Sequence, residues 1–170
     1  MNIQIDTGRI VALEIRRSCI GYAVLQGPRQ LLDWGTTSPS PLSNAPERAR
    51  NRVLFILKLL APAAVVVRKS RADASQSVIL RIVRAEVSRR SIPIVILRQD
   101  QIRQALNIIR SGNKDETAEL LTRIFPELLF KLPRKRRAWQ SEPHAMLAFD
   151  AVAVGLAFWL RQGSDGSETQ

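Results

Sequence analysis

Three short apolar segments follow one another near the start of the chain, and the spacers between them constrain the fold more than any other feature. The segments 9–15, 19–26 and 30–36 have the composition of β-strands. The spacers "RRS" and "GPR" are only long enough to form turns, and such spacers join neighbouring antiparallel strands. The sequence therefore predicts an antiparallel meander at the start of the fold.

Helices and strands alternate after this meander. Apolar residues at helical spacing predict helices, and short β-branched runs predict buried strands. The order indicates an α/β fold with a mixed five-stranded sheet flanked by helices. The predicted elements are a helix over 45–62, a strand over 63–68, a helix over 72–90, a strand over 92–97 and helices over 99–109, 113–125 and 141–160.

Composition agrees with one folded domain and suggests an anionic partner. The chain has 170 residues, of which 45% are hydrophobic, and we expect a single domain over 1–162 and a disordered tail over 163–170. Its formal net charge of +11 favours nucleic acid as partner, with an anionic membrane surface second. A merely basic, soluble protein is the plainer alternative.

Several classes of site are excluded. Cys19 is the sole cysteine and His144 the sole histidine, which excludes an intramolecular disulfide, a cysteine zinc cluster and a histidine-rich metal site. The sequence has no glycine-rich phosphate loop, no HExxH and no GxSxG. The N-terminus lacks the layout of a signal peptide, and the longest apolar run is short and contains Asp150. We therefore expect a cytoplasmic protein without a membrane span.

Two carboxylates in apolar surroundings are the remaining chemical signal. Glu14 ends the first predicted strand, and Asp150 lies in the middle of the apolar last helix. A carboxylate in such a position needs a hydrogen bond, an ion pair or a metal. Carboxylates brought together by a fold bind Mg²⁺ and support phosphodiester hydrolysis. The structural alternatives are a solvated strand end for Glu14, and a hydrogen bond to a neighbouring helix end or an arginine partner for Asp150.

The chain resembles the RuvC-type Holliday-junction resolvases, which have the RNase H-like fold. Four local patterns carry the resemblance over about residues 9 to 160, and their order and spacing are similar to those of the family. They are "ALEIRRSCIGYAVL", "APAAVVVRKSRADASQSVILRIVRAEV", "RQALNIIRSGNKDETAELLTRIF" and "PHAMLAFDAVAVGLAF". The resemblance implies a homodimer that acts on branched DNA, with four carboxylates that bind Mg²⁺.

The resemblance assigns only part of that carboxylate set to this chain. The first-strand acid falls on Glu14, one methylene longer than the usual aspartate, and one last-helix acid falls on Asp150. The fourth-strand glutamate falls on or beside Arg68, and the other last-helix acid falls on Leu147. The family's lysine at the start of the penultimate helix falls on Lys114. Glu14 and Asp150 are thus the candidate catalytic and metal-binding residues.

An arginine at the fourth-strand position changes the expected chemistry. Arg68 would pair with Glu14 or Asp150 and compete with Mg²⁺ for the same oxygens. A shift of register could bring in Asp73 instead. His144 could serve as a ligand, although it lies six residues before Asp150 and so points about 120° away on a helix.

Basic residues gather in places suited to nucleic acid. Arginine and lysine bind phosphates, and an adjacent aromatic ring can stack on an unpaired base. Trp139 adjoins one basic run, although it could equally cover the last helix, and that run could equally be a solvated loop. The candidate nucleic-acid-binding residues are Arg68, Lys69, Arg71, Lys114, Arg134, Lys135, Arg136 and Arg137, and one predicted helix adds Arg81, Arg84, Arg89 and Arg90.

The leading functional hypothesis is a diverged RuvC-like protein that binds structured or branched DNA and has an impaired metal site. One alternative is an active Mg²⁺-dependent crossover junction endodeoxyribonuclease that uses Glu14 and Asp150. Another is a non-catalytic protein-interaction module on the same fold. The position of Arg68 relative to the two carboxylates separates a lost metal site from a retained one.

Overall fold

The computed structural model describes residues 8–16, 19–37, 45–69, 74–108, 114–132 and 145–165. Several candidate residues of the sequence lie outside these ranges. They are Arg71, Asp73, Arg134, Lys135, Arg136, Arg137, Trp139 and His144.

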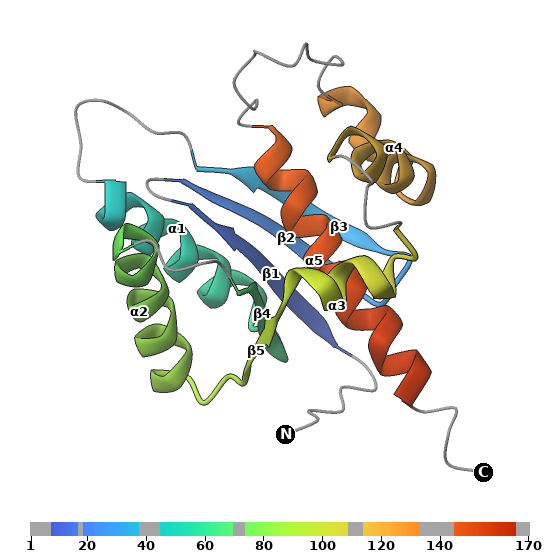
Figure 1. Cartoon of the computed structure of the whole chain (residues 1–170). Coiled ribbons are helices and arrows are strands. Elements are labelled where there is room, and N and C mark those ends of the chain that lie inside the picture. The colour runs from blue at the N-terminus through green and yellow to red at the C-terminus, as the bar shows by residue number, and fades with distance from the viewer. Residues whose placement is uncertain are drawn as a thin grey trace.

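Five strands form one mixed sheet, as predicted. The order across the sheet is β3-β2-β1-β4-β5. The first three strands are an antiparallel meander, whereas β4 runs parallel to β1 and β5 runs parallel to β4 (Figure 1). The strands are β1 (Arg9–Ile15), β2 (Ile20–Gln26), β3 (Leu31–Thr36), β4 (Ala64–Arg68) and β5 (Ile94–Leu97).

Two helices, α1 (Ala45–Leu60) and α2 (Ala74–Arg89), cover one face of the sheet. Their inner faces bury most of the apolar side chains that recur at helical spacing, namely Val53, Ile56 and Leu57 on α1 and Ile79, Val83 and Val87 on α2. Val11 and Leu13 of β1 contribute to the same hydrophobic cluster, because alternate residues of a strand point to the same face.

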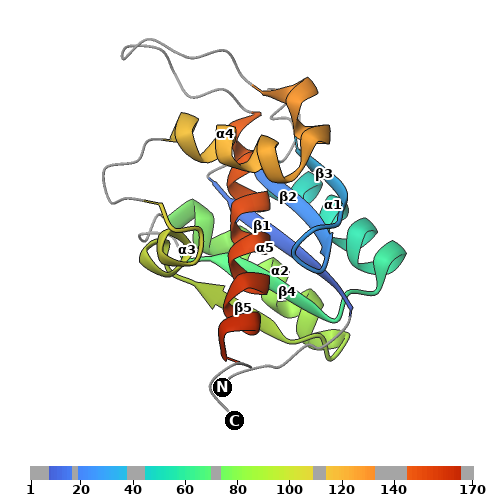
Figure 2. The same cartoon turned by 90° about the vertical axis from the view of Figure 1, so that its right-hand side faces the viewer.

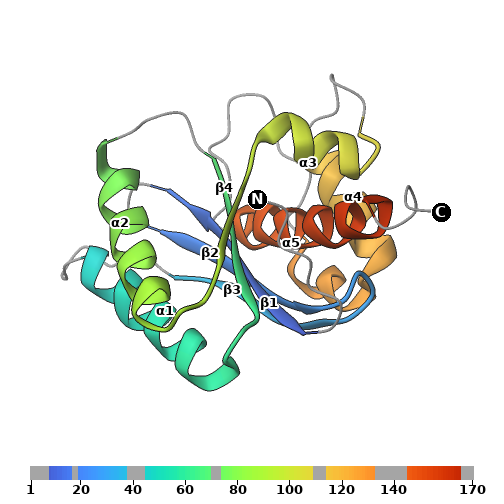
Figure 3. The same cartoon turned by 90° about the horizontal axis from the view of Figure 1, so that it is seen from below.

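The opposite face is covered by α5 (Met146–Asp165), with α3 (Gln99–Ala105), α4 (Lys114–Ile124) and the 3-10 helix η1 (Pro126–Lys131) around it. Figure 2 shows α5 running across the sheet, and Figure 3 shows the resulting three layers. In the ranges that the structure describes, no helix is both long enough and apolar enough to cross a membrane.

Two glycines let α5 lie directly on the sheet. A Cβ on Gly21 of β2 would collide with the carbonyl oxygen of Leu147, and a Cβ on Gly155 would lie 3.1 Å from the Cβ of Ala12. Glycine at such positions allows two backbones to approach closely. Since Gly21 is paired with Glu14 in the sheet, this contact holds the first turns of α5, and with them Asp150, above the end of β1.

Several predicted bounds shift by one or two residues in the described ranges, and three differences are larger. Helix α3 ends at Ala105 rather than 109, because Asn107 adopts a left-handed conformation (φ 53°) and closes the helix. Residues 126–131, to which no element was assigned, form η1, with a proline in its first turn. Helix α5 continues to Asp165, so positions 163–165 are helical where a disordered tail was expected.

Candidate functional site

Glu14 is a buried carboxylate on the face of the sheet that α5 covers. Ile10 and Ala12 precede it at the two-residue period of a strand and belong to the core beneath α5. Only 1% of the residue is exposed. The expectation that Glu14 ends a central strand is correct, but the alternative of a solvated strand end is wrong, because α5 shields it from water.

Arg68 ends the neighbouring strand β4 and pairs with this carboxylate. The register that places Val67 beside Leu13 brings Arg68 next to Glu14. Its Nη2 donates a hydrogen bond to Glu14 Oε1, and its Nη1 donates to Gln99 Oε1 at 2.8 Å. The predicted pairing of Arg68 with a carboxylate is therefore confirmed for Glu14.

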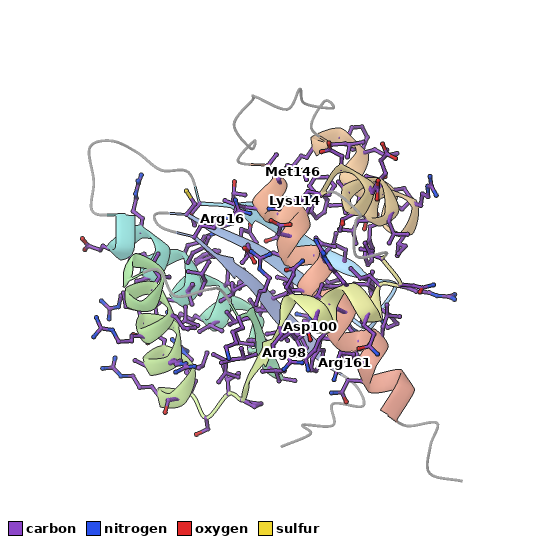
Figure 4. All side chains as sticks on the ribbon, in the orientation of Figure 1. Arg16, Arg98, Asp100, Lys114, Met146 and Arg161 are labelled. Atoms are coloured by element: carbon purple, nitrogen blue, oxygen red, sulfur yellow. The ribbon has the colours of Figure 1, made fainter. Side chains whose placement is uncertain are left out.

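Asp150 is held by two other cations. Arg16 Nη2 donates to Asp150 Oδ2 at 3.0 Å, and Lys114 Nζ donates to the same oxygen at 2.8 Å. Arg16 also reaches Glu14, with 3.7 Å between its Nε and Glu14 Oε1, and so links the two carboxylates. Figure 4 shows Arg16 and Lys114 near the N-terminal half of α5.

We call Glu14, Arg16, Arg68, Lys114 and Asp150 the ion-pair cluster. Its three cations exceed its two carboxylates in number. The pKa of Glu14 is raised to about 7, chiefly because burial disfavours the charged form. Arg68 opposes this rise most strongly, the negative charge of Asp150 adds to it, and Arg16 and Lys114 also act against it. Glu14 Oε2 has no hydrogen-bond partner, so the pairing with Arg68 does not compensate fully for the loss of water.

A pocket opens beside the ion-pair cluster, between the end of β4 and the helices α3, α4 and α5. Three cations, Arg68, Arg103 and Lys114, line it together with Asp150. Thr117 adds a hydroxyl group, while Ile102, Leu106, Ile108, Ala153 and Val154 supply apolar walls. A pocket with this excess of positive charge suits an anionic group such as a phosphate.

The ion-pair cluster does not fit Mg²⁺. The ion prefers an octahedral set of oxygen ligands, but each carboxylate here is already bound by cations. Arg68 occupies the position of one expected acid, and the buried Leu147 occupies another. Among the residues described, no group of three or more histidine, cysteine, aspartate or glutamate side chains could hold a metal ion.

The remaining candidate residues are spread more widely. Lys69 is exposed directly after β4, and its backbone N–H donates to the carbonyl of Leu97. Lys114, assigned to nucleic acid, lies within the ion-pair cluster. Arg71 and the run from Arg134 to Arg137 are outside the described residues, so their assignment stays a prediction.

Arg16 was missed because it was placed in the turn after β1. The backbone N–H groups of Arg16 and Cys19 each donate to the other residue's carbonyl, which extends the antiparallel ladder past Ile15. A signal was present in the sequence, since Arg16 lies two residues after Glu14 and a strand would point both side chains the same way.

Comparison with known proteins supports this architecture at the level of the fold. No family model and no curated protein matches the sequence. Thermus thermophilus RuvC superposes with a TM-score of 0.69 at 20% identity, covering 91% of this chain and 96% of that one. The same protein in complex with a Holliday junction substrate gives 0.69 at 21% identity, with coverages of 92% and 97%.

A more distant structure has the same arrangement. The yeast mitochondrial Holliday junction resolvase Ydc2 superposes with a TM-score of 0.57 at 10% identity, covering 92% of this chain and 80% of that one. The predicted RNase H-like α/β fold with a mixed five-stranded sheet is thus confirmed, and this chain has the fold of the RuvC Holliday junction resolvases.

Proposed function

We propose that this chain is a RuvC-like nucleic-acid-binding protein that recognises structured or branched DNA without cutting it. The ion-pair cluster carries the proposal. In it, Arg68 binds the carboxylate of Glu14, and Arg16 and Lys114 bind that of Asp150. Internal cations thus take the place that a divalent ion would need, and they leave a surplus of positive charge for phosphate.

The fold and the net charge of the chain support a DNA partner. The solved structures that share the fold include a RuvC bound to a Holliday junction, and the chain carries a formal charge of +11. We assign phosphate contacts to the cationic pocket beside the ion-pair cluster, to Lys69 and Arg71, and to the run Arg134 to Arg137. A homodimer and a cytoplasmic setting belong to the same proposal.

Binding and cleavage assays on one substrate pair test the proposal. The purified chain is titrated into a four-way DNA junction and into a linear duplex of the same length and composition. We expect tighter binding to the junction than to the duplex in EDTA, where no divalent ion is present, and no cleavage with Mg²⁺ or Mn²⁺. Affinity should fall steeply with salt, because bound phosphates release counterions.

The alternatives give different results in the same assays. Metal-dependent cleavage that Asp150→Asn abolishes would establish the endonuclease alternative. Equal and feeble binding to both DNAs would contradict the proposal. If neutralising Arg134 to Arg137 leaves binding to DNA unchanged, the result favours the interaction module over the assigned phosphate contacts.

A further inference from the structure

The positive charge of the described helices lies mainly on the side of the sheet opposite the ion-pair cluster. Residues 45–60 and 74–90, which hold α1 and α2, contain eight arginines and lysines against two glutamates, a net charge of +6. The opposite layer, made of α3, α4, η1 and α5, contains five basic and seven acidic side chains, a net charge of −2. The two layers therefore differ strongly in charge.

The acid of α2 is withdrawn from the surface. Glu86 is buried, and its Oε1 lies 3.4 Å from Arg50 Nη2 on α1 and 3.5 Å from Arg89 Nη1 on α2. The two arginines cover the carboxylate, and one of them, Arg89, keeps 71% of its side chain exposed. The exposed surface on this side of the molecule therefore carries cations with hardly any opposing charge.

Exposed arginines lie on the outer face of α2 and just after its C-terminal end. Arg81 and Arg84 are three residues apart and so lie on neighbouring positions of one helical face, and Arg90 follows the last turn. At the helical rise, the stretch from Arg81 to Arg90 covers about 14 Å, a length along which duplex DNA presents about eight phosphate charges. Several phosphates can therefore be contacted at once.

We propose that the outer face of α2, with Arg50 of α1 beside it, is a second nucleic-acid surface that binds the phosphate backbone. This inference rests on the proposed DNA-binding function and names a surface that adds to its affinity. Figures 1 and 3 show α1 and α2 on one side of the sheet and α5 on the other. The ion-pair cluster and its pocket belong to the α5 side. Phosphate contacts position a protein without reading base sequence, so this face binds duplex DNA of any sequence.

The chemistry of the face favours nucleic acid over a lipid surface. A helix that binds a bilayer needs an apolar side free to enter the lipid. The apolar side of α2, with Ile79, Val83 and Val87, is buried against the sheet. Among the described side chains of α2, the exposed ones include cations that can reach phosphates and no large apolar group to insert.

A charge-neutralising triple variant tests this surface. Arg81→Gln, Arg84→Gln and Arg90→Gln are combined and compared with wild type by fluorescence titration on duplex and junction DNA. The matched control combines Arg123→Gln, Lys131→Gln and Arg161→Gln, which removes the same charge from the opposite layer. A second control replaces the three α2-side arginines by lysine, and circular dichroism checks the folding of every variant.

The α2 triple variant should bind duplex and junction at least about tenfold more weakly at low salt, with the salt slope reduced by about 2.7. The lysine variant should keep most of the affinity, and the opposite-layer variant should stay near wild type. If the wild type binds DNA but the opposite-layer variant loses more affinity than the α2 variant, this surface is wrong and the proposed function stands. If the wild type binds only vesicles of anionic lipid, or no DNA at all, both proposals fail.

Discussion

Glu14 has lost nearly all contact with water, so its titration probes the ion-pair cluster directly. Its pKa is raised to about 7, and the folded chain therefore binds a proton more readily than the unfolded chain between about pH 4.5 and 7. By linkage, this group lowers the free energy of unfolding as the pH rises through that window. The effect reaches at most about 3 kcal/mol.

Glu14→Gln removes this titration. Urea denaturation at pH 5 and at pH 8 measures the unfolding free energy of wild type and of Glu14→Gln. From pH 5 to pH 8, wild type should lose stability relative to the variant. If wild type keeps or gains stability relative to Glu14→Gln between pH 5 and pH 8, then Arg68 holds Glu14 ionised throughout this range.

In the proposed function, Arg68 is the residue that most directly excludes a metal ion. Arg68→Glu places a third carboxylate beside Glu14 and Asp150, and we expect millimolar Mg²⁺ to raise the melting temperature of this variant, because a ligand that binds only the folded state stabilises it. Wild type and Arg68→Gln should show no such shift. A Mg²⁺ shift in wild type would contradict the ion-paired description of the site.

At the scale of the element, the contact between β2 and α5 sets the position of Asp150. Gly21→Ala should lower the free energy of unfolding by about 1–3 kcal/mol, since the added methyl group meets the backbone at Leu147. It should also weaken the preference for junction DNA by displacing Asp150. Gly163→Ala is the control, because a Cβ there has open space and alanine favours a helix by up to about 1 kcal/mol. If Gly21→Ala and Gly163→Ala change the free energy of unfolding equally, the close approach of α5 to β2 at Gly21 is not needed for stability.

The elements were predicted better than the cluster they assemble. Periodicity located all five strands, because buried β-branched runs such as β4 are distinctive. It misplaced the end of α3, where one asparagine in a left-handed conformation outweighs continuing apolar residues. The pairing of Arg68 with Glu14 followed from the resemblance. The link through Arg16 was missed because it depends on how far the pairing of β1 with β2 extends beyond Ile15, and local composition does not encode that length.

At the scale of the whole molecule, the charge asymmetry restricts how two copies can meet. If the proposed homodimer forms, the family resemblance implies a contact through the helices over 73–90 or 99–124. A two-fold contact brings the same patch of both subunits together, so a dimer through α2 would set its exposed arginines against the same arginines of the second copy. The layer with α4 and η1 has no such excess of charge, and Phe130 of η1 is 93% exposed.

We therefore predict that the homodimer forms through the end of α4 and η1. Phe130→Asp should raise the dissociation constant at least about a hundredfold, because each subunit loses a large apolar contact. Leu59→Asp, on the exposed side of α1, should leave it unchanged. Sedimentation velocity at low and high salt measures both variants, and wild-type dimers should change little with salt. A dimer that strengthens as salt rises and ignores Phe130→Asp would place the contact on α2, where screening of the arginines would relieve their repulsion.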